Sequence, residues 1–322
     1  MFKSLKKLIS VKQDHISVTV DEIIDVVVDE SIHKIRLING YRRKMRKPVE
    51  NALSYCAELA ERIPGTLDLS GKDPAASEII GGFFKSPEEA RTVVTESTDV
   101  RQFLNETDVD ELYLLMTMNR RTKTVFDSGI QGQIVVRDIA TKAYLFEEHK
   151  LVLPSDTLEG AYRAIRMALL KSLSHIALEL TLERQRREVE LEQLRDELDV
   201  KLKLIRDDHQ QLAIDGNTEE GDSLYTDSQI LLNEVERELE KVQTSGDHLT
   251  SYLNQVTKIL SNPGQYLEVD LLPMKMNRIG VFVKDDSKKE EGNLCIAEFK
   301  FGDIESRSAV LIKCHRNQLK TG

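Results

Sequence analysis

The segment between residues 215 and 226 comes nearest to a metal-binding loop. Asp215, Asn217 and Glu219 stand at its first, third and fifth positions, where an EF-hand places oxygen ligands for calcium. The sixth position requires glycine for a sharp turn but holds Glu220, and the twelfth holds Thr226 where a bidentate glutamate is needed. The sequence therefore favours a solvated turn, and we expect neither a metal nor another cofactor.

The cysteines offer a second possible metal site. They are Cys56, Cys295 and Cys314. If "NLCIAEFKF" and "SAVLIKCH" form a hairpin with Phe301 opposite Ser308, Cys295 and Cys314 become neighbours on one apolar face. His315 then lies on the other face, so the three groups do not complete a tetrahedral zinc site. We therefore expect the thiols to pack as small apolar side chains in a reducing cytoplasm.

No stretch of the chain carries a recognisable catalytic signature. The sequence contains no phosphate-binding or dinucleotide-binding glycine loop, no G-x-S-x-G turn and no H-E-x-x-H motif. No run approaches the roughly 18 apolar residues that span a bilayer, and the N-terminus lacks the features of a secretory signal. We expect a protein that is not an enzyme and that acts by binding.

Basic side chains gather near the N-terminus of an otherwise acidic chain. Residues 1–50 hold 11 lysines and arginines against 7 acidic residues, whereas the remaining residues hold 34 against 48. Two clusters could contact an anionic surface: Lys3, Lys6, Lys7 and Lys12, and Arg42, Arg43, Lys44, Arg46 and Lys47. Because the rest of the chain is acidic, we do not expect it to wrap nucleic acid over a broad surface.

Residues 1–12 form a basic amphipathic segment. At helical spacing Phe2, Leu5, Leu8 and Ile9 fall on one side and the four lysines on the other. The segment is either a helix docked on its own protein or a weak, reversible contact of a peripheral protein with the inner membrane. We prefer the docked helix.

Residues 20–63 carry apolar side chains at helical spacing. Pro48 should break this run, so we expect two helices that meet near "RKMRKPVE". The basic cluster at 42–47 could hold phosphates, as in an accessory factor that associates with nucleic acid. It could equally be a solvated helix face, or pair with acidic side chains of a coiled coil.

Two heptad runs follow the body of the chain and indicate an antiparallel coiled-coil hairpin over residues 182–261, with a polar tip at 214–227. The second helix should have about 34 residues. The expected interface is Leu191, Leu194, Leu198, Ile205, Leu212, Leu232, Val235, Leu239, Val242, Leu249, Leu253, Val256 and Leu260. Arg184 and Arg187 also fall at interface positions of this heptad frame, where a charged side chain needs a partner.

Short apolar segments over residues 107–153 predict an antiparallel meander inside an α+β body spanning 64–181. Four further apolar segments predict a small antiparallel β domain over 265–322. The expected fold is thus a mixed α+β body with a projecting coiled-coil hairpin and a C-terminal β domain.

One stretch within residues 64–155 carries a resemblance. "FFKSPEEARTVVTESTDVRQFL", followed by "RRTKTVF", resembles an uncharacterised family of proteobacterial cytoplasmic proteins. The resemblance implies a bacterial origin and no particular activity. We therefore expect a cytoplasmic scaffold or adaptor that self-associates or binds a protein partner through its hairpin. The alternatives are a peripheral membrane protein and a factor associated with nucleic acid.

Overall fold

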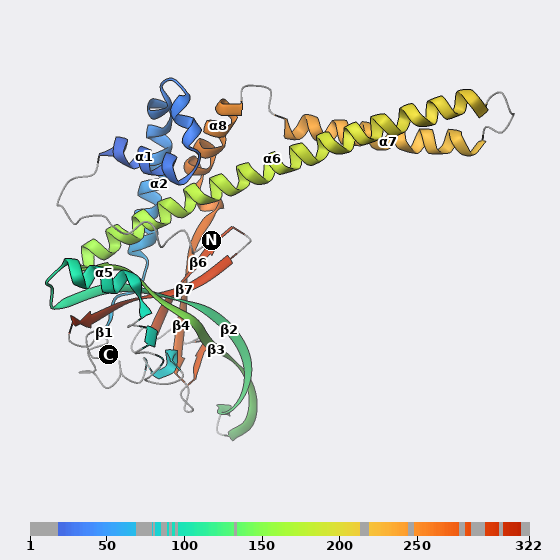
Figure 1. The fold of residues 1–322 in the computed structure, drawn as a ribbon. Helices are drawn as coiled ribbons and strands as arrows, with labels where there is room; N and C mark the ends of the chain where they lie inside the picture. The colour runs from blue at the N-terminus through green and yellow to red at the C-terminus, as the bar shows by residue number, and fades with distance from the viewer. Residues whose placement is uncertain are drawn as a thin grey trace. The chain divides into compact units, whose positions relative to one another are not determined.

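The computed structural model describes most of the chain in two compact units. The described residues are 19–68, 79, 81–84, 89, 92–93, 96–131, 134–212, 219–243, 248–276, 281–284, 294–302 and 305–316. We call residues 50–173 and 261–322 the sheet unit, and residues 20–49 and 174–260 the helical unit. Figure 1 shows long helices together with a mixed sheet, so the expected α+β class is confirmed.

The sheet unit is built on seven strands. They are β1 (Leu67–Asp68), β2 (Glu111–Gln131), β3 (Ile134–Ser155), β4 (Leu267–Met276), β5 (Phe282–Lys284), β6 (Leu294–Phe301) and β7 (Glu305–His315). Their order is β1-β7-β2-β3-β5-β4-β6, and β6 also pairs with β7, so six strands close into a ring. Only the β1–β7 pair among these strands is parallel.

The predicted meander of short strands is wrong, because β2 and β3 are two long strands of one antiparallel hairpin. Three irregularities in their register each add one residue to β3. At two of them Glu148 and Leu153 adopt positive φ angles of 54° and 56°, as expected of bulges. Polar residues between the apolar segments, such as Arg120, Arg121, Thr141 and Lys142, lie within the strands and pair in register, so the expected turns are absent there.

The C-terminal strands complete the same sheet and do not form a β domain of their own. β7 pairs with β2 along eight residue pairs, from Glu111 opposite His315 to Met118 opposite Ser308. Sequence patterns mark each strand, but they contain no information about its distant neighbour. The predicted domain boundary near residue 265 is therefore not a boundary, because the strands that follow it pair with strands that precede it.

The register proposed for β6 and β7 is also wrong. Ala297 lies opposite Ala309, which places Cys295 opposite Pro273 of β4 and Cys314 opposite Leu112 of β2. β7 is buried on both faces, with Val310 and Leu311 each no more than 1% exposed. Because both faces are apolar, the alternation of residues could not select one register.

A large apolar cluster fills one face of the sheet. Its members include Leu112, Leu114, Met116 and Met118 of β2, and the aromatic rings of Phe83, Phe146 and Phe282. The ring centroids of Phe83 lie 5.3 Å and 4.9 Å from those of Phe146 and Phe282. Because strand side chains alternate, Leu115 and Thr117 lie on the opposite face.

The helices are α1 (Val20–Glu30), η2 (His33–Leu37), α2 (Tyr41–Glu61), α5 (Thr98–Glu106), α6 (Leu158–Leu212), α7 (Glu219–Val242), α8 (His248–Ser261) and η3 (Pro263–Gln265). The predicted break at Pro48 is wrong, because α2 continues through it. The chain turns earlier, where Gly40 has a φ of +71° before α2 begins. Met45, Val49 and Ala52 are fully buried around the proline, and this packing offsets the lost hydrogen bond.

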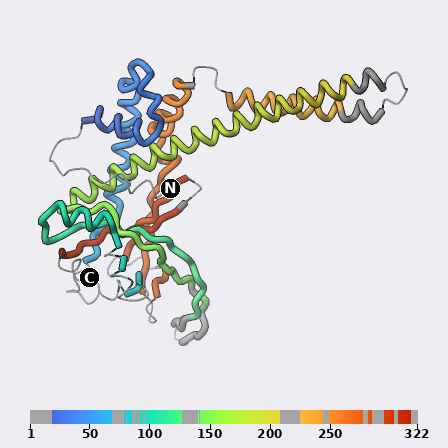
Figure 2. Tube along the Cα trace, in the orientation of Figure 1, coloured from blue at the N-terminus to red at the C-terminus, as the bar shows by residue number. Residues whose placement is uncertain are grey.

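The predicted second hairpin helix is two helices. α7 ends at Val242 and α8 begins at His248. α7 already begins at Glu219, so that part of the expected tip is helical, while residues 213–218 and the N-terminal segment 1–12 lie outside the described residues. Figure 2 shows α7 alone running beside the second half of α6.

Candidate partner-binding surface of the helical hairpin

The second half of α6 and α7 pack as an antiparallel helical hairpin. Their buried apolar side chains form one cluster: Leu191, Leu198, Leu202, Leu232, Val235 and Leu239, with Tyr225 and Val242 partly buried against it. These residues recur at intervals of three, four and seven, which keeps them on one side of each helix. We call this cluster the seam.

The seam contains six of the thirteen residues expected at the interface. Leu194 is 38% exposed, Ile205 is half-buried, and the side chain of Leu212 is not described. The remaining four residues lie on α8: Leu253, Val256 and Leu260, which are buried, and Leu249, which is half-buried.

The sequence frame missed Leu202, which is 6% exposed. Beyond Leu191 the seam follows positions 195, 198 and 202, whereas the predicted frame followed 194, 198 and 201. The two frames are equally polar, because one holds Leu194 and Lys201 and the other holds Arg195 and Leu202. Heptad spacing alone therefore did not distinguish them, and the packing of α7 against α6 decides which frame is buried.

Polar contacts hold the two helices in register along the seam. Arg184 donates from Nε to the carbonyl oxygen of Val242 over 2.8 Å, which satisfies a C-terminal carbonyl of α7. Arg187 forms an ion pair with Glu238 at 2.7 Å. Farther along, Arg206 donates to the hydroxyl of Tyr225 over 2.9 Å. The two arginines expected in the stripe therefore have partners on α7.

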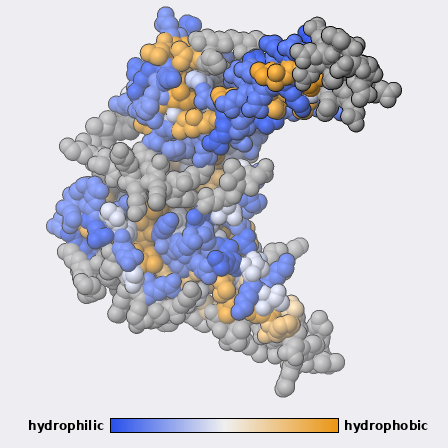
Figure 3. Space-filling view, turned by 45° about the vertical axis from the view of Figure 1, so that its right-hand side comes forward, coloured by the Kyte–Doolittle hydropathy of each residue, from blue (hydrophilic) through white to orange (hydrophobic). Residues whose placement is uncertain are grey.

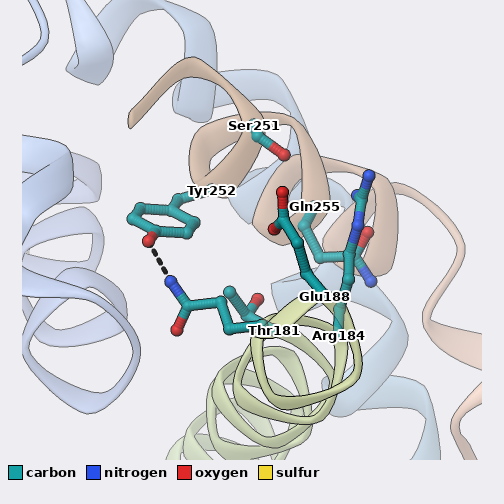
Figure 4. A pocket seen from close by; sticks show the side chains of 7 residues that line it. Thr181, Arg184, Glu188, Ser251, Tyr252 and Gln255 are labelled. Atoms are coloured by element: carbon teal, nitrogen blue, oxygen red, sulfur yellow. Dashed lines mark hydrogen bonds between the residues drawn. The ribbon is translucent and has the colours of Figure 1, made fainter. Parts of the chain in front are cut away.

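A small polar cleft lies where α6 meets α8 (Figure 4). Thr181, Arg184, Gln185 and Glu188 line it from α6, and Ser251, Tyr252 and Gln255 line it from α8. The Gln185 amide donates to the Tyr252 hydroxyl across the cleft. Arg184 also bonds to the end of α7, so the cleft is a polar joint among three helices.

The side of α6 that faces away from the seam carries a second apolar stripe. We call it the outer stripe, and its members are Leu182 (50% exposed), Val189 (51%), Val200 (57%) and Leu204 (60%). At about 100° per residue these four positions fall within roughly 60° of one another, and they are centred about 180° from the seam. Figure 3 shows hydrophobic residues on the surface of the hairpin among hydrophilic ones.

The outer stripe runs along an almost balanced set of charges. Residues 182–207 hold seven basic and eight acidic side chains. Leu182 and Leu204 are 22 residues apart, which corresponds to about 33 Å of helix. A stripe of this length and charge balance suits a partner helix laid along α6.

The basic cluster at 42–47 is partly neutralised within the helical unit. Arg42 contacts both carboxylate oxygens of Asp25, at 3.0 Å and 2.7 Å, and Arg46 pairs with Asp21 at 2.7 Å. Arg43, Lys44 and Lys47 are exposed. Pairing with the coiled coil was one of the alternatives for this cluster, but Arg42 and Arg46 pair with α1, and fewer cations remain for phosphates.

Asp25 is the carboxylate most affected by this cluster. Its burial raises the pKa, but hydrogen bonds from Arg42 and Tyr41 outweigh that effect and hold the pKa below its ordinary value. The hydroxyl of Tyr41 donates to Asp25 Oδ1 over 3.1 Å, and Arg42 donates to this oxygen as well. The site is thus an internal ion pair that joins α1 to α2.

Within the described residues, no helix is long and apolar enough to cross a membrane. Across the same parts of the chain, no three histidine, cysteine or acidic side chains gather as metal ligands would. The resemblance of residues 64–155 to a bacterial family stays a prediction. Comparison of the chain with protein-family models, with curated proteins and with solved structures found no match.

Proposed function

We propose that this chain is a non-enzymatic cytoplasmic scaffold or adaptor, and that its helical hairpin binds a protein partner or a second copy of the chain. The outer stripe of α6 is the observation that carries the proposal. Four aliphatic side chains that are at least half exposed lie in one line on a helix whose opposite side is already packed. Single exposed apolar residues are common, but an aligned series marks an interaction surface.

The geometry favours recognition of a helix over recognition of a small ligand. The stripe is a convex ridge, whereas sites for small molecules are concave. A partner with apolar residues at helical spacing would cover the stripe in the way that α7 covers the seam.

The proposal is tested by placing charge on the outer stripe. The double variant Val200→Asp and Leu204→Asp should keep its fold, because both side chains are exposed. Ile230→Asp is the matched control, because Ile230 is 53% exposed but lies on α7. Self-association is measured by analytical ultracentrifugation, and partner capture by quantitative mass spectrometry from the native cell.

We expect the stripe variant to lose self-association or one reproducible partner at least tenfold, while the control retains both. A stripe variant that matches the wild type in both measurements would refute the proposal. Circular dichroism on all three proteins establishes that any loss does not come from unfolding.

A further inference from the structure

The outer stripe of α6 is symmetric about a polar residue. Gln193 is exposed and lies eleven residues from Leu182 on one side and eleven residues from Leu204 on the other. At about 100° per residue both leucines fall within about 20° of the direction of Gln193. A stripe that is the same in both directions from its middle can pair with a second copy of itself in the antiparallel orientation.

Five charged side chains follow one flank of the outer stripe. At about 100° per residue they fall about 20° to 80° to one side of Gln193, and we call them the charged flank: Glu183, Arg186, Glu190, Glu197 and Lys201. All five are exposed. Glu190 lies 3.9 Å from Arg187 of its own helix, whereas the other four form no ion pair within the described part of the chain.

An antiparallel pair of α6 helices would bring opposite charges together. The charged flank then meets its own copy, because the same flank of both helices lies on one side of such an interface. With a two-fold axis at Gln193, Glu183 lies within about 3 Å of helix rise of Lys201 of the second copy. Arg186 lies within about 4.5 Å of rise of Glu197 of the second copy. Symmetry forms each pair twice.

A parallel pair of α6 helices would bring like charges together. The charged flank would then meet the opposite flank of the second copy, which carries Asp196 and Lys203. Glu197 would lie one residue from the level of Asp196, and Lys201 two residues from the level of Lys203. Neighbouring like charges are destabilising, so the charge pattern favours the antiparallel orientation.

Gln193 suits a position on the two-fold axis. Its amide has both donors and an acceptor, so the amides of two copies can bond to each other. A shift of register would place this amide against an aliphatic side chain, which costs free energy because the hydrogen bond is lost. Beside it, Val200 lies at the level of Arg186 of the second copy, whose methylene groups can cover it.

We propose that two copies of this chain pair through their outer stripes, with α6 antiparallel to α6 and a two-fold axis at Gln193. Leu182 of each copy contacts Leu204 of the other, and the charged flank supplies four ion pairs. This inference rests on the proposed function, because it names a second copy of the chain as the partner of the same surface.

Charge reversal in the full-length protein tests the register. Glu183→Lys and Lys201→Glu each replace two opposite-charge pairs by two like-charge pairs, and the double variant restores both pairs. We expect the dimer dissociation constant, measured by analytical ultracentrifugation, to rise about tenfold in each single variant and to return within about threefold of the wild type in the double. Glu236→Lys on α7 makes the same change at an exposed position outside the stripe and should leave the constant unchanged. A double variant no tighter than the single ones would overturn the register.

Disulfide formation tests the two-fold axis. Under mild oxidation Gln193→Cys should link two chains, because residues on the axis face each other. Val189→Cys is the control, since two such residues would lie eight residues, or about 12 Å, apart along the antiparallel pair, whereas a disulfide joins Cα atoms within about 7 Å. Mass spectrometry identifies the linked peptides. Absence of the link at 193, or equal yields at both positions, would overturn the antiparallel pairing.

The Val200→Asp, Leu204→Asp variant distinguishes failure of this inference from failure of the proposed function. Loss of the wild-type dimer in this variant supports both. A monomeric wild type, together with loss of a captured partner in the variant, would overturn the dimer and leave the proposed function standing. A dimer and a set of partners that both survive in the variant would overturn both.

Discussion

Two adjacent leucines of α7 provide a stringent test of the hairpin. Leu232 is 7% exposed and belongs to the seam, whereas Leu231 is 43% exposed and does not. Replacing either residue by alanine makes the same chemical change one position apart. Any difference between the two variants therefore reports the packing of the seam and not the helix propensity of α7.

The expected magnitude follows from what each substitution removes. Leu232→Ala deletes three buried carbons, which are worth about 2.4 kcal/mol at roughly 0.8 kcal/mol each, and leaves a cavity besides. A seam between only two helices can partly collapse, so we expect about 2–3 kcal/mol in total. Leu231→Ala should cost about 1.4 kcal/mol or less by the same rule, because 43% of the side chain is already in water and no cavity is left.

Native-state hydrogen exchange read by mass spectrometry is the assay of choice. Peptides covering the seam should exchange roughly 30- to 150-fold faster in Leu232→Ala, since each 1.4 kcal/mol is tenfold. Peptides of β4 and β6 belong to the sheet unit and serve as an internal reference that should not change. Equal acceleration in both leucine variants would refute the seam as the element that holds the hairpin together.

Two further predictions concern titratable groups. Burial raises the pKa of Cys56 and of Cys314 to about 12, so both thiols should react slowly with a disulfide reagent at pH 8, and Cys295, which is half-buried, should react first. Rapid reaction of all three cysteines in the native protein would contradict this order. The pKa of Asp25 is held below its ordinary value of 3.8, so its ion pair stabilises the helical unit above that pH and loses this effect as the pH falls through the lower folded value. Asp25→Asn should therefore lower the denaturant midpoint at pH 7, and the difference from the wild type should shrink as the pH falls below 3.8 and through the lower folded pKa. A difference that does not change with pH would count against the pair.

Several elements were predictable because their signals are local. The absence of proline between Leu158 and Leu212, together with an apolar periodicity, predicted the helix α6. The C-terminal strands were recognisable from short apolar runs bounded by polar segments. Breaks between helices were harder to predict from the sequence. Pro48 is tolerated inside α2 because of packing that cannot be read from the sequence alone.

The candidate partner-binding surface was likewise predictable only in part. Six seam residues were predicted from heptad spacing, since their side of the helix is fixed by the helical period. The residues of the outer stripe are also visible in the sequence. Because α6 carries apolar residues on two opposite sides, the sequence alone does not say which side is buried. Which side becomes buried depends on where α7 packs, and that is a property of the tertiary structure.

The sequence by itself therefore determined the long helix, the helical hairpin and the strand-forming segments, because each depends on residues close together in the chain. Only the tertiary structure decided that β7 lies between β2 and β6, and that Cys295 and Cys314 are not opposed. It also decided which stripe of α6 remains exposed. The physical reason is that strand register and helix pairing are chosen by contacts between separate segments of the chain, as between β2 and β7 or between α6 and α7, where one apolar face can satisfy another in more than one way.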